Sequence, residues 1–163
     1  MAIPCFPEEY KILMPAITAA ANAVVYDVIS CKNLHKVWFI IQHCGATDVD
    51  LTLQLYEATD VAAATNAIVT ATFPIWVDTS VSVTSDTLVR QTDAAVYTID
   101  VGAGGDDQLV IIEWDPAKHT AGYDCIYIVD GATAAGSASN TVTVLAIGAT
   151  RYQQDTPPTA ILN

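Results

Sequence analysis

Apolar and polar residues alternate along most of the chain, and turn-forming Gly, Asp, Asn and Pro interrupt the alternation at short intervals. In Leu51–Tyr56, for example, a leucine stands at every second position, so that one face of the segment is apolar. A period of two is typical of a half-buried β-strand, and β-branched residues are frequent in the same segments. The pattern predicts strands at Ala23–Ser30, Lys36–His43, Val49–Tyr56, Ala67–Val77, Ser80–Val89, Ala95–Val101, Gln108–Glu113, Tyr123–Val129 and Thr141–Ile147. It predicts loops at Cys44–Thr47, Thr59–Thr65, Gly102–Asp107, Asp115–Gly122 and Asp130–Asn140.

Two of the predicted strands are apolar on both faces. Val37–Ile41 and Leu109–Ile112 contain no polar side chain, which is typical of central strands that are covered on both sides. Trp38, Trp76 and Trp114 lie in or next to apolar strands, where packing in a core or an interface is expected. We therefore predict an all-β fold, a β-sandwich, in which another layer or another subunit covers the second face of these strands.

The chain is predicted to form one domain with an extended arm at each end. No repeat of fixed period is apparent, and no linker divides the chain into two domains. Residues 1–21 hold three of the seven prolines, and Pro15 interrupts the helix-like part of this segment. We assign residues 1–21 to an N-terminal arm, 22–150 to the sandwich core, and the proline-bearing residues 151–163 to a C-terminal arm.

Charge narrows the classes of partner. The chain has 18 acidic and 6 basic residues and a formal net charge of −12, so it repels nucleic-acid phosphates and anionic lipid headgroups. Lys32 and Lys36 form the densest basic group, and two lysines are too few for a nucleic-acid-binding patch. No apolar run is long enough to cross a bilayer. We expect no nucleic-acid and no membrane partner, and the apolar content of 52% indicates burial both in a core and against other proteins.

The cysteines and the first residues indicate where the chain folds. Cys5, Cys31, Cys44 and Cys125 are sparse and irregularly spaced in a chain too long to need a disulfide framework. The first ten residues lack the charged and apolar regions of a signal peptide. We therefore expect reduced thiols and synthesis in a cytoplasm.

The best candidates for a metal site are Cys31, His35, His43 and Cys44, because thiolates and imidazoles suit zinc. In an extended strand His43 and Cys44 point to opposite faces, and His35 and His43 stand ~26 Å apart at ~3.3 Å per residue. We therefore expect no metal site here, but isolated thiols and surface histidines.

Other candidate chemistry is incomplete. Asp48 and Asp50, or Asp106 and Asp107, could ligate a hard cation, but the rest of a calcium loop is missing, and aspartate is common in solvated turns. Gly102–Gly105 resembles a phosphate-binding loop, but no Lys-Ser/Thr pair and no helix follow it. The chain has no Gly-x-Ser-x-Gly motif. We expect no cofactor, no metal and no catalytic residues, and thus a protein that is not an enzyme.

Four segments resemble one protein family. Val28–Gln42, in which Lys-Asn precedes His-Lys and an aromatic strand, is similar to a strand of small capsid-associated proteins of tailed bacteriophages. Leu51–Asp60, Gly122–Ile126 and Ala149–Ile161 resemble the same family, so the resemblance spans most of the chain. These motifs are structural rather than catalytic.

The resemblance implies a sandwich of jelly-roll type that serves as a head decoration, or cement, protein. Its partners would be the major capsid protein and further copies of itself, for example in a trimer, and its location the outer capsid surface of the virion after synthesis in the host cytoplasm. The same small β-modules also occur on tails and head fibres. The resemblance suggests that the terminal arms and one sandwich face make the contacts. The interface candidates in the arms are Ile3, Pro4, Phe6, Tyr10, Tyr152, Pro157, Pro158, Ile161 and Leu162.

Two alternatives belong to other functional classes. In a carbohydrate-binding or host-adhesion module, Trp76 or Tyr123 would form an exposed stacking platform for a sugar. In an esterase-like enzyme, His35, His43 or His119 would lie within reach of a serine and a carboxylate. The exposure of the aromatic rings and the partners of the histidines discriminate among these hypotheses.

Overall fold

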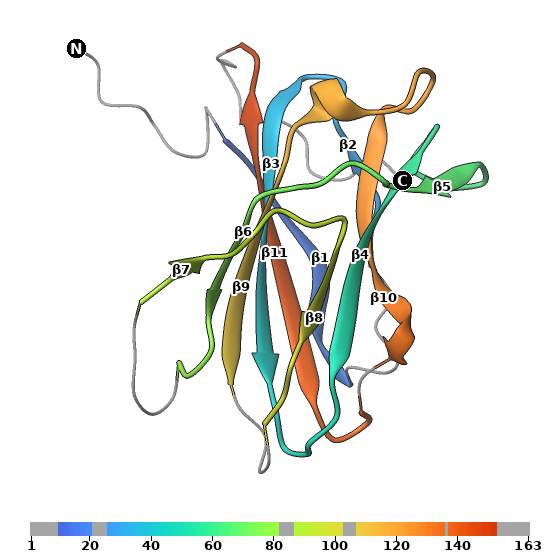
Figure 1. Cartoon of the computed structure of the whole chain (residues 1–163). Coiled ribbons are helices and arrows are strands. Elements are labelled where there is room, and N and C mark those ends of the chain that lie inside the picture. Colours follow the sequence, from blue (N-terminus) through green and yellow to red (C-terminus); the bar gives the residue numbers. More distant parts are fainter. Residues whose placement is uncertain (1–9, 21–25, 82–86, 103–106, 136, 153–163) are drawn as a thin grey trace.

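The structure, a computed structural model, describes residues 10–20, 26–81, 87–102, 107–135 and 137–152. They form two antiparallel β-sheets that pack together (Figure 1). The elements are β1 (Tyr10–Ala20), β2 (Ile29–Ser30), β3 (Leu34–Cys44), β4 (Leu51–Ala58), β5 (Asn66–Ile68), β6 (Ile75–Asp78), β7 (Val89–Arg90), β8 (Val96–Ile99), β9 (Gln108–Trp114), the 3-10 helix η1 (Pro116–Lys118), β10 (Cys125–Ala135) and β11 (Thr141–Thr150). Among the described residues, no helix has the length and apolar character needed to cross a membrane.

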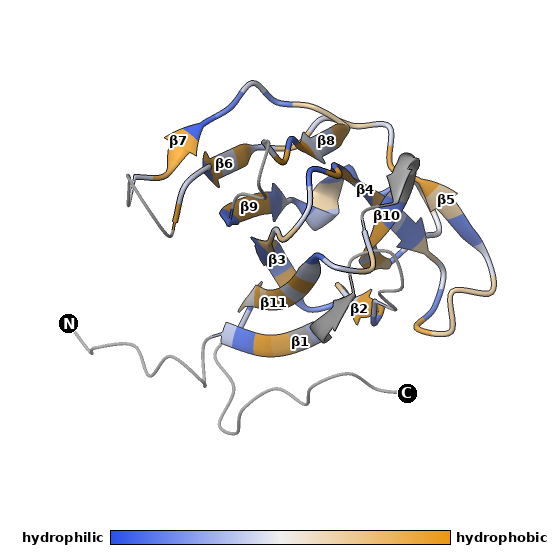
Figure 2. Cartoon of the chain, turned by 90° about the horizontal axis from the view of Figure 1, so that it is seen from below, coloured by the Kyte–Doolittle hydropathy of each residue, from blue (hydrophilic) through white to orange (hydrophobic). Residues whose placement is uncertain are grey.

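The strands alternate between the two sheets in a regular way. The six-stranded sheet has the order β1-β11-β3-β9-β6-β7, and the five-stranded sheet has the order β2-β10-β4-β5, with β8 also paired to β4. Thus β1 pairs with β11, β2 with β10, β3 with β9, and β4 with β8, all antiparallel. Strands β5, β6 and β7 fall between β4 and β8 in sequence, and β6 and β7 extend the larger sheet. The predicted all-β sandwich is confirmed, and Figure 2 shows its two layers end-on.

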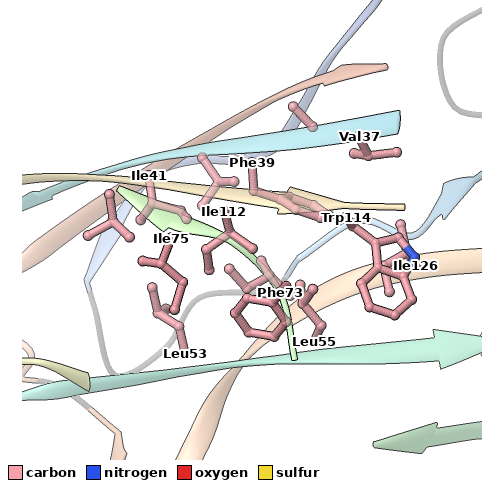
Figure 3. Close-up of a cluster of buried hydrophobic side chains, with 14 of the residues drawn as sticks. Val37, Phe39, Ile41, Leu53, Leu55, Phe73, Ile75, Ile112, Trp114 and Ile126 are labelled. Atoms are coloured by element: carbon pink, nitrogen blue, oxygen red, sulfur yellow. The ribbon is translucent and has the colours of Figure 1, made fainter. Parts of the chain in front are cut away.

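The core lies between the sheets and is apolar throughout its centre. On β3, Val37, Phe39 and Ile41 are fully buried, and on β4, Leu53 and Leu55 are fully buried opposite them (Figure 3). Every second residue of each strand points inward, as the period of two predicted. Burial of each large aliphatic side chain stabilises the fold by ~1.5–3 kcal/mol. The interior positions of β3 and β4 therefore hold the two sheets together.

A β-bulge at His35 sets the start of β3. The register with β11 shifts between Leu34 and Lys36, so His35 has no counterpart on the partner strand. The bulge leaves His35 exposed and turns Leu34 into the core, where it is 2% exposed. The side chain of Leu34 then lies against Gly148 of β11, where an added Cβ would come within 2.7 Å of Leu34 Cδ1. Only glycine fits this close approach without displacing Leu34.

Part of the expected N-terminal arm belongs to a sheet. Residues 10–20 form β1 at the edge of the six-stranded sheet, with an irregular register around Pro15. An edge strand has one side without a ladder, so it tolerates a proline that would break a central strand. The Pro15 carbonyl accepts a hydrogen bond from the Asp27 N–H at 2.8 Å. The parts of the two arms at residues 1–9 and 153–163 lie outside the described residues.

Several predicted element boundaries differ from the structure. The predicted strand Ala67–Val77 is two strands, β5 and β6, because the chain crosses between the sheets there. The predicted loop Asp130–Asn140 begins later, since β10 continues along β4 to Ala135 past a register shift. In the described parts of the predicted strands Ser80–Val89 and Ala23–Ser30, only the residues of β7 and β2 are in strands. The period of two marked these segments as extended, but pairing partners decided where each ladder ends.

Candidate functional site

The six-stranded sheet has an outward face that is also apolar. On β3, β9 and β11, hydrophobic side chains that alternate with the core positions are half-buried. The register aligns Leu145, Ile40, Ile111 and Trp76 in one row across four strands. Among the described residues no further sheet covers this row. We call the outer apolar face the following set of residues: Trp38, Ile40, Trp76, Leu109, Ile111, Leu145 and Ile147.

Polar neighbours hold the two tryptophans of this face in place. The indole Nε1–H of Trp38 donates a hydrogen bond to Glu113 Oε2 at 2.9 Å, and the same carboxylate forms an ion pair with Lys36. The guanidinium of Arg90 lies 4.9 Å from the centroid of the Trp76 ring, a cation–π contact. A ring that is already ordered loses little entropy when a partner binds against it. The two tryptophans are therefore preorganised contact surfaces.

A hollow of about 400 Å³ lies at one end of the outer apolar face. We call the sandwich end at which β3 begins and β11 ends the upper end, and the opposite end, which carries the hollow, the lower end (Figure 1). Apolar side chains make up most of the hollow's surface. The lower hollow is lined by Ile40, Gln42, Val81, Asp107, Gln108, Leu109, Thr143 and Leu145. Its shape and lining suit one apolar side chain of a partner.

A smaller, polar cleft of about 290 Å³ lies at the upper end. Lys32 Nζ and Asp124 Oδ2 form an ion pair across it at 3.2 Å. The Nε–H of Arg151 donates to the Leu34 carbonyl at 3.2 Å, which places the guanidinium beside the start of β3. The lining of this upper cleft is Cys31, Lys32, Pro116, His119, Tyr123, Asp124 and Arg151. It offers charged groups and one aromatic ring to a small polar ligand.

The one histidine in this cleft already has a partner for each ring nitrogen. His119 Nδ1 lies 3.3 Å from Glu57 Oε2, and the Trp114 indole N–H donates to His119 Nε2 at 3.4 Å. The Thr120 N–H also donates to Glu57 Oε2, at 2.9 Å. Burial lowers the pKa of His119 below its ordinary value, although Glu57 acts in the opposite direction. The imidazole is therefore neutral at pH 7, ties the loop after η1 to β4, and offers no nitrogen to a substrate.

The residues considered for a zinc site are spread along β3 and the loop before it. His35 is exposed at the upper end, whereas His43 is fully buried near the lower end, since it shares the inward face of β3. The expectation of surface histidines is therefore wrong for His43. Cys31 is buried and Cys44 half-buried, and burial raises the pKa of both thiols, as it raises that of Cys125 to about 12. Within the described part of the chain, no three His, Cys, Asp or Glu side chains gather to hold a metal ion.

Three of the aspartates named for a hard cation, Asp48, Asp50 and Asp107, are among the described residues and lie at the lower end. Asp50 Oδ1 accepts a hydrogen bond from the Val101 N–H at 3.0 Å, so it joins the loop before β4 to the one after β8. Asp48 is exposed, and Asp107 lines the lower hollow. Residues 103–106, which include the rest of the glycine-rich segment, lie outside the described residues. Thus Asp48 is an exposed loop residue, Asp50 links two loops, and Asp107 lines the hollow.

Two of the interface candidates in the arms, Tyr10 and Tyr152, are among the described residues. Tyr10 begins β1 and is half-buried, and Tyr152 is 73% exposed just after β11. Both lie at the upper end, because Tyr10 stands opposite Ala149 in the register. The others lie outside the described residues: Ile3, Pro4, Phe6, Pro157, Pro158, Ile161 and Leu162.

Sequence reasoning missed the outer apolar face as a site, although its signal was present. Val37–Ile41 and Leu109–Ile112 are apolar on both faces, and either another layer or a subunit interface was expected to cover them. In Thr141–Ile147, outward Leu145 and Ile147 follow outward Thr143, so the alternation there becomes apolar toward the upper end. The neighbour relations of β3, β9 and β11 were needed to join these residues into one surface.

Comparison with models of known protein families finds none that matches this chain. A comparison with curated proteins likewise finds no match. The function must therefore be derived from the surfaces and buried polar groups of the molecule itself.

Proposed function

We propose that this chain is a non-catalytic structural protein that binds other proteins in a virus particle, as a decoration protein on the outer surface of a tailed-phage capsid. The observation that carries the proposal is the outer apolar face, a row of hydrophobic side chains across four strands with two tryptophans held in place. A contiguous, half-exposed apolar sheet face of this kind is typical of protein interfaces. Its partners would be the major capsid protein and further copies of the chain.

The strand pairing supports a jelly roll as the finer fold. The first strand pairs with the last, the second with the next to last, and so on inward to β4 and β8. This is the arrangement of one long antiparallel ribbon rolled into two sheets, with β5, β6 and β7 inserted at its closed end. Jelly rolls are common in viral capsid proteins and in lectins, so the fold alone does not select the function.

The buried polar groups favour a non-catalytic role. Both nitrogens of His119 are engaged, by Glu57 and by Trp114, so this imidazole is not a free base. The raised pKa values of Cys31 and Cys125 keep these thiols protonated and poorly nucleophilic. Neither group has the arrangement of an activated nucleophile.

A carbohydrate-binding module is the second candidate function, and the upper cleft supports it. Tyr123 lines this cleft beside Asp124, Lys32 and Arg151, a combination of ring and polar groups that suits a sugar. Trp76 fits the role less well, because Arg90 already lies over its ring. A glycan array with wild type and Tyr123→Ala tests this candidate: Tyr123-dependent binding would favour it over the capsid function.

The capsid proposal is tested on phage heads. We expect wild-type chain to sediment with heads from which it was omitted, and cryo-electron microscopy to show it on their outer surface. Ile111→Ser, in the middle row of the outer apolar face, should lower occupancy by about tenfold, since burial of this side chain contributes on the order of 1.5–3 kcal/mol. Ile68→Ser is the matched control, because Ile68 is 48% exposed on the five-stranded sheet.

Two outcomes would contradict the proposal. Absence of the chain from the heads at any concentration would exclude the capsid function. Equal occupancy by Ile111→Ser and wild type would exclude the outer apolar face as the contact. Circular dichroism melts of both variants establish that they are folded before occupancy is compared.

A further inference from the structure

Charge is distributed unevenly between the two ends of the sandwich. All six basic residues lie in the described part of the chain, and five of them are at the upper end or beside it: Lys11, Lys32, Lys36, Lys118 and Arg151. The sixth, Arg90, is on the edge strand β7, opposite Trp76 and about halfway between the two ends (Figure 1). No basic side chain therefore lies at the lower end.

At the lower end, by contrast, the charged residues that the structure describes are all aspartates. Asp48 and Asp50 lie in the loop between β3 and β4, and Asp100 follows β8 beside them, because Leu51 pairs with Ile99. Asp107 precedes β9 and lines the lower hollow. At physiological salt an exposed charge acts on a partner over about 8–10 Å before it is screened. The lower hollow is thus an apolar depression at the acidic end of the molecule.

We propose that the lower hollow is a docking site for an apolar side chain on a lysine- or arginine-rich segment of another protein. Ile40, Leu109 and Leu145 line the hollow with apolar groups that would contact this side chain, and Gln42 and Thr143 add polar groups to the lining. Asp107 in the lining and the other aspartates of the lower end attract the flanking basic groups. The same charges repel a nucleic acid and an acidic protein surface. This inference rests on the proposed function in one respect, namely that the partner is a protein.

Proximity to the outer apolar face explains why one anchor would suffice. Ile40, Leu109 and Leu145 belong both to this face and to the hollow, so a segment seated in the hollow continues directly onto the row that contains Ile111. Interfaces commonly combine one pocket that holds an anchor side chain with a flatter apolar surround that excludes water. The hollow would supply the anchor and the electrostatic orientation, and the face the remaining contact area.

The experiment uses the full-length chain, labelled with ¹⁵N, and three blocked pentapeptides. The first has one leucine between two pairs of lysines, the second has glycine in place of leucine, and the third has aspartate in place of lysine. We expect the leucine peptide to bind about tenfold more tightly than the glycine peptide, as burial of a leucine side chain requires. Amide shifts should concentrate at Ile40, Leu109 and Leu145, and the aspartate peptide should not bind. Raising the salt should weaken the leucine peptide.

Two variants with matched controls locate the site. Leu109→Ser removes part of the apolar lining of the hollow, and Asp107→Lys reverses a charge in it. Each variant should bind the leucine peptide about fivefold or more weakly than wild type. Val96→Ser is the control for Leu109, because Val96 is 38% exposed on the other sheet. Asp60→Lys is the control for Asp107, since Asp60 is exposed at the upper end. Both controls should bind like wild type, and the amide spectrum of each variant reports whether it is folded.

Equal affinity of the leucine and glycine peptides would overturn the inference, as would shifts centred on the upper cleft. If Asp60→Lys lost as much affinity as Asp107→Lys, the net charge of the chain would explain the loss, and the inference would likewise be contradicted. The peptides could fail to bind the hollow while wild-type chain occupies phage heads and Ile111→Ser loses that occupancy. In that case the docking inference is wrong and the structural function stands. If the peptide bound in the hollow but the chain did not bind to phage heads, the docking site would stand and the capsid function would be excluded.

Discussion

Within Val37–Ile41 both faces of β3 are apolar, but their environments are very different. Val37, Phe39 and Ile41 point inward and are fully buried, whereas Trp38 and Ile40 point outward and are half-buried. The inward set meets β4 across the core, and the outward set belongs to a surface that no described sheet covers. A contiguous apolar patch that the fold does not need for its own core indicates a partner, whereas single apolar residues on a surface do not. The difference between the two faces therefore separates what stabilises the protein from what it presents.

The largest effect should come from comparing neighbours on this strand. Phe39→Ala should lower the free energy of unfolding by ~3–5 kcal/mol, through lost transfer energy and a cavity in the core. Trp38→Ala should cost only ~1–2 kcal/mol in the isolated chain, for a half-exposed ring and the hydrogen bond to Glu113. Urea unfolding of both variants measures the difference. Equal costs would show that the outward face is enclosed by this chain itself.

The bulge that determines which side chain of β3 turns inward gives the next largest effect. Gly148→Ala should lower the free energy of unfolding by ~1–3 kcal/mol, because the new methyl group would lie within 2.7 Å of Leu34 Cδ1. The double variant Gly148→Ala with Leu34→Ala removes the clash, so the two changes should cost less together than the sum of their separate costs. Strict additivity in urea titrations would argue against the close packing at this bulge.

The His119 cluster predicts a pH dependence at the upper end of the core. Because burial lowers the pKa of His119 in the folded state, the unfolded chain takes up a proton more readily. Stability from this group is complete above the unfolded pKa of ~6.5 and decreases as the pH falls below it. His119→Gln should lower the free energy of unfolding by ~1–2 kcal/mol at pH 7 and flatten its decrease between pH 7 and pH 5. If His35→Gln, at the exposed bulge, flattened the curve equally, His119 would not be the titrating group.

The smallest effect on stability is expected on the outer apolar face. Ile111→Ser should change the free energy of unfolding by no more than about 1 kcal/mol, since Ile111 is half-exposed in the isolated chain. The same change is expected to reduce occupancy of phage heads by about tenfold. A thermal melt and the sedimentation assay, made on one preparation, compare the two. A large loss of stability would place Ile111 in the core of the fold and weaken the proposed function.

The sequence alone determined the fold class and most of the strands, because period-two alternation reports burial directly. The segments that became β3, β4, β9 and β11 were predicted close to their observed bounds. It also indicated that Val37–Ile41 and Leu109–Ile112 need cover on two faces. It did not reveal β1, since Pro15 is unfavourable in a helix and in a central strand alike, and only an edge position accommodates it.

Only the tertiary structure decided which of these residues act together. The outer apolar face joins β3, β6, β9 and β11, whose neighbour relations depend on pairings far apart in sequence. The lower hollow and its acidic surroundings likewise combine loops that register alone brings to one end. The contact of His119 with Glu57, which ties the loop after η1 to β4, spans two elements that no local pattern links. Alternation along a strand shows which side chains are buried. Which side chains lie side by side on neighbouring strands depends on long-range pairing, and a surface or a site consists of such adjacent side chains.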